Sequence, residues 1–225
     1  SQSTPPPSPP KPLSPLLPLS HGTTTCTLTF VSPETHTPYV VVASDSRSSR
    51  STFVSSSRVL KILPCSRTTL ATMAGGAADC HYVLTCSPDS ATLKARSLAI
   101  SDYLFSSRDL SVGTMLSAVE GGTPKAYYLD SEGQRLRITY RAVGSGQETA
   151  QSVLSDFARA HPPPPELMGT VGAECELEEA VAAVREAVVQ ATRRDGYSGG
   201  VVQVYVVEEG GWYKKEAVDW GRVTD

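Results

Sequence analysis

The amino-acid sequence predicts an α+β fold, a four-layer αββα sandwich in which two antiparallel sheets pack face to face and helices cover both outer faces. Short alternating or β-branched runs, each bounded by turn-forming residues, indicate strands. Two separate blocks with apolar residues three and four positions apart indicate helices. These segments follow one another as strands, helices, strands, helices and strands, and two packed sheets with outer helices account for that order.

The first part of the chain predicts a leader followed by two hairpins. Residues 1–20 hold proline so densely that they can form only extended or disordered structure. The alternating runs 23–30 and 39–46 are joined by a short polar turn, which indicates an antiparallel hairpin. Residues 58–64 and 68–75 repeat that layout, so we expect a second hairpin there.

Two short helices are expected between Ala77 and Phe105. One face of this first helical block carries Leu93, Ser97, Ile100 and Leu104. Three strand-like runs follow, at 112–120, 125–130 and 135–143, and a glycine-containing turn joins the last two.

A second pair of helices is expected after these strands, and residues 176–194 give its strongest signal. Acidic residues begin this segment and two arginines end it, as the helix dipole favours. Its apolar stripe consists of Val181, Val184, Val188 and Ala191. Residues 199–218 then predict a closing hairpin over Gly210 and Gly211.

Composition excludes several classes of function. A chain of 225 residues fits one domain, and 20 basic against 23 acidic residues give a net charge of −3 with no nucleic-acid footprint. The five scattered cysteines fit neither a disulfide framework nor a metal site, so we expect a reducing compartment. No apolar run reaches the roughly 20 residues of a membrane helix, and no cofactor is indicated. Without an initiating Met, Ser1 is not expected to be the native start.

Five motifs occur in an order that is specific. They are "HGTTT" at 21–25, "TMAGGAADC" at 72–80, "YYLDSEG" at 127–133, "VGSG" at 143–146 and "RDGYSGG" at 194–200. With these motifs the chain resembles the proteasome beta subunits, above all their chymotrypsin-like beta type-5 group, over most of its length after His21. The resemblance implies an N-terminal-nucleophile hydrolase, with residues 1–22 as a propeptide and residues 23–225 as one catalytic domain.

The resemblance also implies a threonine endopeptidase that frees its own nucleophile by cutting between Gly22 and Thr23. An alcohol needs an adjacent base, and an α-amine with an unperturbed pKa of about 7.7–8.0 titrates near working pH. Thr23 would supply both groups. Lys61 would stand beside it as a cation oriented by Asp45. The implied hydrogen-bonded surround of Thr23 is Ser145, Asp195 and Ser198.

A substrate site follows from the same resemblance. Gly75 is implied as the backbone donor to the oxyanion, because glycine allows close backbone approach. The implied specificity pocket consists of Val59, Met73, Ala74, Ala77 and Cys80, and it suits a large apolar side chain. Arg47, Ser48 and Ser49 would flank the channel, where Ser49 would contact the peptide as an added strand.

Several of these residues also fit ordinary structural roles. Taken alone, Asp45 fits an ordinary turn residue and Lys61 a solvated surface group, while Met73 and Cys80 also fit ordinary core. The chain departs from the family in three places: Ser48 and Ser49 replace alanine and threonine, residues 79–113 look shorter, and Pro162–Pro165 mark an inserted loop. The shortening would leave the two helices truncated or one of them missing.

The family further implies alpha and beta subunit partners, with two stacked seven-membered beta rings capped by alpha rings. It implies unfolded polypeptide substrates, ubiquitin-dependent degradation, and a place in the cytoplasm and nucleus. A noncatalytic ring subunit is the alternative function, and a small-molecule amidase of the same fold is a weaker one.

Overall fold

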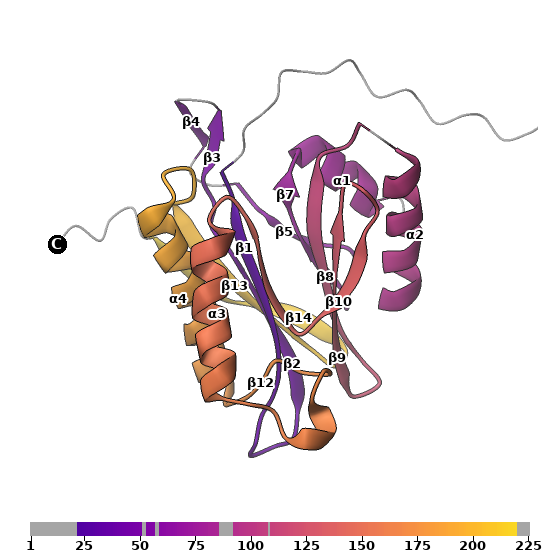
Figure 1. Ribbon diagram of the computed structural model, residues 1–225, viewed down its shortest axis with the longest axis vertical. Coiled ribbons are helices and arrows are strands. Elements are labelled where there is room, and N and C mark those ends of the chain that lie inside the picture. Colours follow the sequence, from indigo (N-terminus) through magenta and orange to yellow (C-terminus); the bar gives the residue numbers. More distant parts are fainter. Residues whose placement is uncertain (1–21, 51–52, 57–58, 86–91, 108, 220–225) are drawn as a thin grey trace, which may run out of the picture.

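The computed structural model describes residues 22–50, 53–56, 59–85, 92–107 and 109–219. Two sheets lie face to face, and a pair of helices covers each outer face (Figure 1). The predicted four-layer αββα sandwich is therefore confirmed. The helices are α1 (Ala77–Thr85), α2 (Leu93–Ser106), α3 (Gln147–Ala160) and α4 (Leu177–Arg194).

The first sheet contains the strand that follows Thr23. Its members are β1 (Thr24–Val31), β2 (Pro38–Ser44), β11 (Tyr140–Gly144), β12 (Ala173–Glu174), β13 (Val201–Glu208) and β14 (Gly211–Asp219). The order is β11, β1, β2, β13 and β14, with β12 beside β1. The β1–β2 and β13–β14 pairings confirm the first and last predicted hairpins. Helices α3 and α4 pack on this sheet.

The second sheet lies under the other two helices. Its members are β5 (Ile62–Pro64), β6 (Leu70–Thr72), β7 (Ala74–Gly75), β8 (Val112–Glu120), β9 (Thr123–Asp130) and β10 (Arg135–Ile138). Pairing of β5 with β6 confirms the second hairpin. A further small hairpin, β3 (Ser48–Arg50) with β4 (Phe53–Ser56), was not predicted.

One predicted strand is wrong. Residues 135–143 do not form a single strand, because β10 ends at Ile138 in the second sheet and β11 begins at Tyr140 in the first. The chain thus changes sheets at Thr139. The Thr139 carbonyl accepts hydrogen bonds from the backbone nitrogen of Thr29, at 2.7 Å, and from its hydroxyl, at 2.8 Å.

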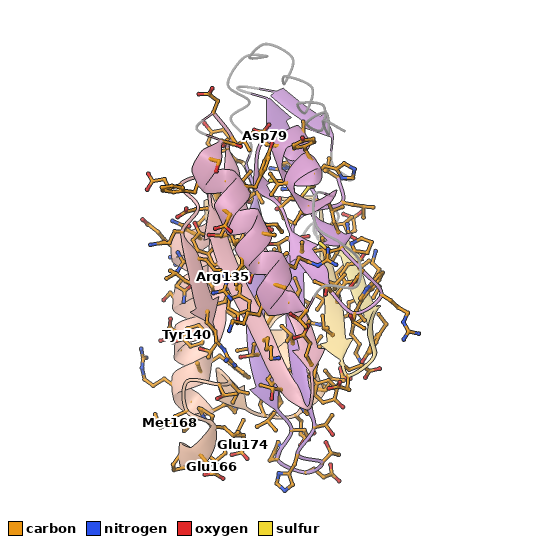
Figure 2. The ribbon with its side chains drawn as sticks, turned by 90° about the vertical axis from the view of Figure 1, so that its right-hand side faces the viewer. Asp79, Arg135, Tyr140, Glu166, Met168 and Glu174 are labelled. Atoms are coloured by element: carbon orange, nitrogen blue, oxygen red, sulfur yellow. The ribbon has the colours of Figure 1, made fainter. Side chains whose placement is uncertain are left out.

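Both helices of the first block are present, with nine and fourteen residues. All four residues of the predicted α2 face are buried. Figure 2 shows α2 lying across the second sheet with Arg135 beside it, and the Nε of Arg135 donates to the Ser97 hydroxyl at 2.7 Å. The Pro162–Pro165 loop leads from α3 into the short 3-10 turn η1 (Pro165–Leu167) at the end of the molecule shown at the bottom of Figure 1.

Alternate side chains along the strands of the first sheet pack against different layers. Cys26, Leu28 and Phe30 contact the α3–α4 layer, whereas neighbouring side chains of β1 face the second sheet. The predicted apolar stripe of α4 is buried against this sheet, in the same hydrophobic cluster as Cys26, Leu28 and Phe30. In the described ranges, no helix has the length and apolar character to cross a bilayer, and no group of His, Cys, Asp or Glu is arranged to hold a metal ion.

Candidate active site

Thr23 lies immediately before β1, with only 4% of the residue exposed. Its hydroxyl donates to the carbonyl oxygen of Gly22 at 2.8 Å. The Gly22–Thr23 bond is intact in this structure, so the nitrogen of Thr23 is an amide and cannot act as a base.

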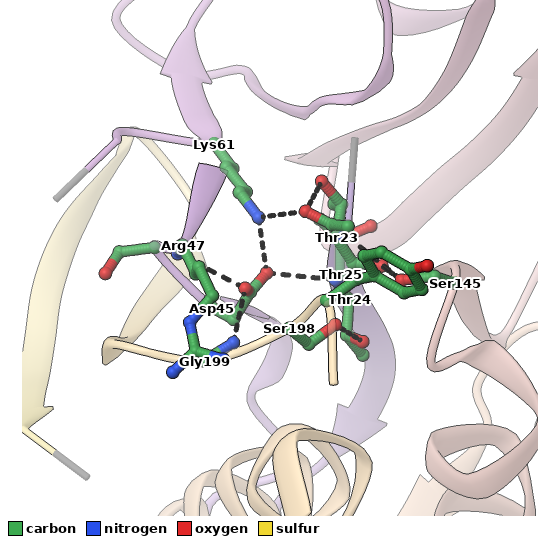
Figure 3. Close-up of polar contacts among 12 residues, drawn as sticks. Thr23, Thr24, Thr25, Asp45, Arg47, Lys61, Ser145, Ser198 and Gly199 are labelled. Carbon is green, nitrogen blue, oxygen red and sulfur yellow. Dashed lines mark hydrogen bonds and ion pairs between the residues drawn. The ribbon is translucent and has the colours of Figure 1, made fainter. Parts of the chain in front are cut away.

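Lys61 and Asp45 form a buried ion pair beside that bond (Figure 3). The Nζ of Lys61 donates to Asp45 Oδ1 at 2.7 Å and to the Gly22 carbonyl at 3.0 Å. Burial lowers the pKa of Lys61 and raises the pKa of Asp45, while their mutual attraction opposes both changes. A cation on the Gly22 oxygen would stabilise negative charge developing there during attack on the Gly22 carbonyl.

Asp45 is positioned by backbone geometry. It directly follows β2, and its carboxylate accepts hydrogen bonds from three backbone nitrogens: Thr24 at 2.9 Å, Gly199 at 2.9 Å and Arg47 at 3.3 Å. These three donors favour the ionised carboxylate. The interpretation of Asp45 as an ordinary turn residue therefore explains its position after a strand but does not explain its buried contacts.

Ser145, Asp195 and Ser198 meet on the other side of Thr23. The backbone nitrogen of Thr23 donates to the Ser145 hydroxyl at 3.1 Å, and that hydroxyl donates to Asp195 Oδ2. Ser198 donates to the same oxygen at 2.6 Å. Burial raises the pKa of Asp195, but the bonds from Ser145 and Ser198 outweigh it and lower the pKa overall. Asp195 is thus an ionised acceptor near neutral pH.

A pocket opens next to Thr23. It is lined by Gly22, Thr23, Arg47, Val59, Lys61, Met73, Gly75 and Ala77. Gly75 has φ +103°, and a Cβ there would lie 2.4 Å from the Ser111 carbonyl, so only glycine fits this backbone. The structure therefore brings the implied oxyanion donor and three of the implied pocket residues to the nucleophile.

The remaining implied substrate residues are distributed differently. Ala74 and Cys80 are buried in the core outside that lining, where the Cys80 thiol donates to the Ala74 carbonyl at 3.4 Å. Ser48 and Ser49 belong to β3, but their side chains lie outside the described part of the structure. Arg47 donates to the Gly196 carbonyl at 3.3 Å, which links the pocket to the loop after α4.

Three contacts of the site were missed from the sequence. The Thr24 hydroxyl lies 2.8 Å from Ser198 Oγ, the Gly199 nitrogen holds Asp45, and the backbone of Tyr197 packs against Gly22. The signals were present: Thr24 belongs to the threonine run, and the other two lie in "RDGYSGG". No spacing rule connects these segments before the fold is known.

Comparison with known proteins places the chain in a family. Residues 20–207 match the family model described as proteasome subunit. The chain belongs to the proteasome subunit family. It is 35% identical over 214 residues to proteasome subunit beta type-5 of Gallus gallus, which covers 89% of this chain and 76% of the relative.

Two further relatives agree. Proteasome subunit beta type-5 of Spinacia oleracea is 37% identical over 195 residues, covering 81% of this chain and 67% of the relative. Proteasome subunit beta type-8 of Canis lupus familiaris is 33% identical over 212 residues, covering 88% and 70%. These similarities place the chain with the catalytic proteasome beta subunits, which are threonine endopeptidases.

Proposed function

We propose that this proteasome subunit cuts its own chain between Gly22 and Thr23 and then cleaves polypeptides after large apolar residues. The observation that carries the proposal is the meeting of three groups at one bond: the Thr23 hydroxyl, the Gly22 carbonyl and the Lys61 ammonium. Once the bond is cut, the nitrogen of Thr23 becomes an amine. It can then take the proton of its own hydroxyl as that oxygen attacks a substrate carbonyl.

The preference for apolar residues rests on the pocket. Val59, Met73 and Ala77 supply apolar lining, and no acidic side chain is among the described residues that line the pocket. Lys61, one of two cations in the lining, is already paired with Asp45. A basic substrate side chain would find no partner there, and burial of an unpaired charge is unfavourable.

Peptide reporters test this preference. We expect kcat/KM to be highest for Phe, Tyr or Leu before the cleaved bond and at least about tenfold lower for Arg or Glu, since roughly 1.4 kcal/mol of differential burial gives that ratio. The reporters should differ only at that position. Faster cleavage after Arg or Glu would refute the pocket assignment.

Assembly is part of the proposal. We propose that the chain works in two stacked seven-membered beta rings capped by alpha rings, in the cytoplasm and nucleus, and degrades unfolded polypeptides in ubiquitin-dependent turnover. Family membership supports this arrangement. The native mass of the active species checks it, and a fully active monomer would contradict it.

The contact between Gly22 and Tyr197 gives a test of autolysis. A Cβ on Gly22 would lie 2.1 Å from both the Cβ and the carbonyl oxygen of Tyr197. Gly22→Ala should therefore displace the bond to be cut and slow autolysis by up to about a hundredfold, as small misplacements do. Intact mass measured over time gives the fraction still carrying residues 1–22.

Gly196→Ala is the matched control for this test. It lies one residue before Tyr197, and a Cβ there meets nothing within 4 Å. This variant should process at the wild-type rate. Normal processing of Gly22→Ala would show that crowding at Tyr197 does not set the position of the bond.

A further inference from the structure

We propose that Thr24 is a positioning residue for the reaction: its hydroxyl, bonded to Ser198, and its backbone, bonded to Asp45, hold Thr23 in place relative to Asp195 and Asp45. This inference rests on the proposed function, because it concerns how the same nucleophile is placed. Thr24 does not line the pocket and does not touch the bond to be cut. Its effect on the reaction is therefore indirect.

Strand geometry separates the two threonines. Successive side chains of a strand point to opposite faces, so Thr23 faces the second sheet while Thr24, like Cys26 and Leu28, faces the α3–α4 layer. Thr24 is fully buried there. A Cβ on Gly146 would lie 2.3 Å from the Thr24 hydroxyl, so the glycine after Ser145 leaves the room that this hydroxyl occupies.

Counting protons fixes the direction of the hydrogen bonds. Ser198 has one hydroxyl proton, which it donates to the ionised Asp195 at 2.6 Å. It must therefore accept from Thr24 Oγ1, which lies 2.8 Å away. Ser145 likewise donates its proton to Asp195 and accepts from the nitrogen of Thr23. Two adjacent threonines thus each donate to a serine, and both serines donate to one carboxylate.

The backbone of Thr24 contacts the other carboxylate. Its nitrogen donates to Asp45 Oδ1 at 2.9 Å, and its carbonyl accepts from the Asp45 nitrogen at 3.1 Å (Figure 3). The same Oδ1 accepts from Lys61. Thr24 is therefore bonded directly to Asp45 and through one hydroxyl to Asp195. A shift of Thr24 would move Thr23 relative to the cation on one side and to Ser145 on the other.

This arrangement predicts an effect on turnover without an effect on substrate binding. Loss of the Thr24 hydroxyl leaves Ser198 with one bond fewer and loosens Asp195, and with it Ser145, the acceptor that orients the Thr23 nitrogen. Binding of the substrate side chain is unchanged, because the pocket residues keep their places. A fall in kcat with constant KM identifies an interaction that matters in the transition state.

The test compares Thr24→Val with Thr24→Ser in the assembled particle. Thr24→Val keeps shape and loses the hydroxyl, so kcat should fall roughly three- to tenfold, the value of one net hydrogen bond, with KM unchanged. Thr24→Ser keeps the hydroxyl and should restore most of kcat. Thr27→Val is the control, since the buried Thr27 hydroxyl has no hydrogen-bond partner among the described residues; its kinetics should match wild type.

Several outcomes would overturn the role of Thr24: a wild-type kcat in Thr24→Val, a raised KM with unchanged kcat, or a serine variant as slow as the valine variant. If valine disturbs folding, Thr24→Ala removes the same hydroxyl without placing a methyl group beside Ser198, and it must show the same fall in kcat. In a Ser198→Ala background, Thr24→Val should cost little more, because the two residues act through one bond. An inactive wild-type particle would instead refute the proposed function.

Discussion

Replacing Lys61 by methionine should leave residues 1–22 attached and should lower peptidase turnover by at least about a hundredfold, the usual effect of removing one group that stabilises an oxyanion. Lys61 contacts the carbonyl oxygen of the bond to be cut, and the Thr23 hydroxyl donates to that same oxygen, so we expect the cation to lie near the hydroxyl in both reactions. Intact mass reports the first effect and reporter hydrolysis the second. Both should be lost together, because one cation serves both reactions.

The variant also leaves Asp45 buried without its cation, which costs about 3–5 kcal/mol of folding free energy in comparable buried pairs. Poor folding could therefore imitate the loss of chemistry. The double variant Lys61→Met with Asp45→Asn removes the unpaired charge, and it should fold better yet stay uncut and inactive. Lys125→Met is the matched control, since Lys125 pairs with Glu120 in a partly exposed ion pair that is not among the contacts of the site. An active Lys61→Met particle would exclude the proposed role.

Thr23→Ala should abolish activity and keep the leader attached, because no hydroxyl remains to attack the Gly22 carbonyl. Thr23→Ser should be cut and should retain partial activity, since the hydroxyl and the new α-amine are both preserved. N-terminal sequencing of the assembled subunit decides between these outcomes. A wild-type chain that still begins upstream of Thr23 would reject the catalytic function and favour a structural subunit.

The strands and helices could be predicted where the hydrophobic periodicity agrees with the residues that typically begin or end such elements. Residues 176–194 combine an apolar stripe with charges suited to both ends, and α4 follows almost residue for residue. The run 135–143 shows the limit of this reasoning. Its alternation continues through Thr139 without glycine or proline, so nothing in the pattern marks the change of sheet. Only the pairing partners of each half reveal it.

The candidate site shows the same limit at shorter range. Motif order and the family resemblance predicted Thr23, Asp45, Lys61 and Asp195, because each lies in a recognisable segment. Gly22 and Tyr197 are 175 positions apart in the chain, and their contact depends on how the fold brings the two backbones together. The residues next to each of them in the sequence do not predict this contact. The reason for a glycine before Thr23 is accordingly crowding from another loop.

The passage of the chain from one sheet to the other at Thr139 bears on how the pocket keeps its width. Thr23 directly precedes β1 of the first sheet, whereas Gly75 ends β7 of the second sheet and Met73 lies between β6 and β7. The continuous chain at Thr139 and the two hydrogen bonds from Thr29 to its carbonyl tie the two sheets together. We expect this tie to limit how far the sheets can separate. Substrate selection by size would then depend on Thr139, which is not among the described residues that line the pocket.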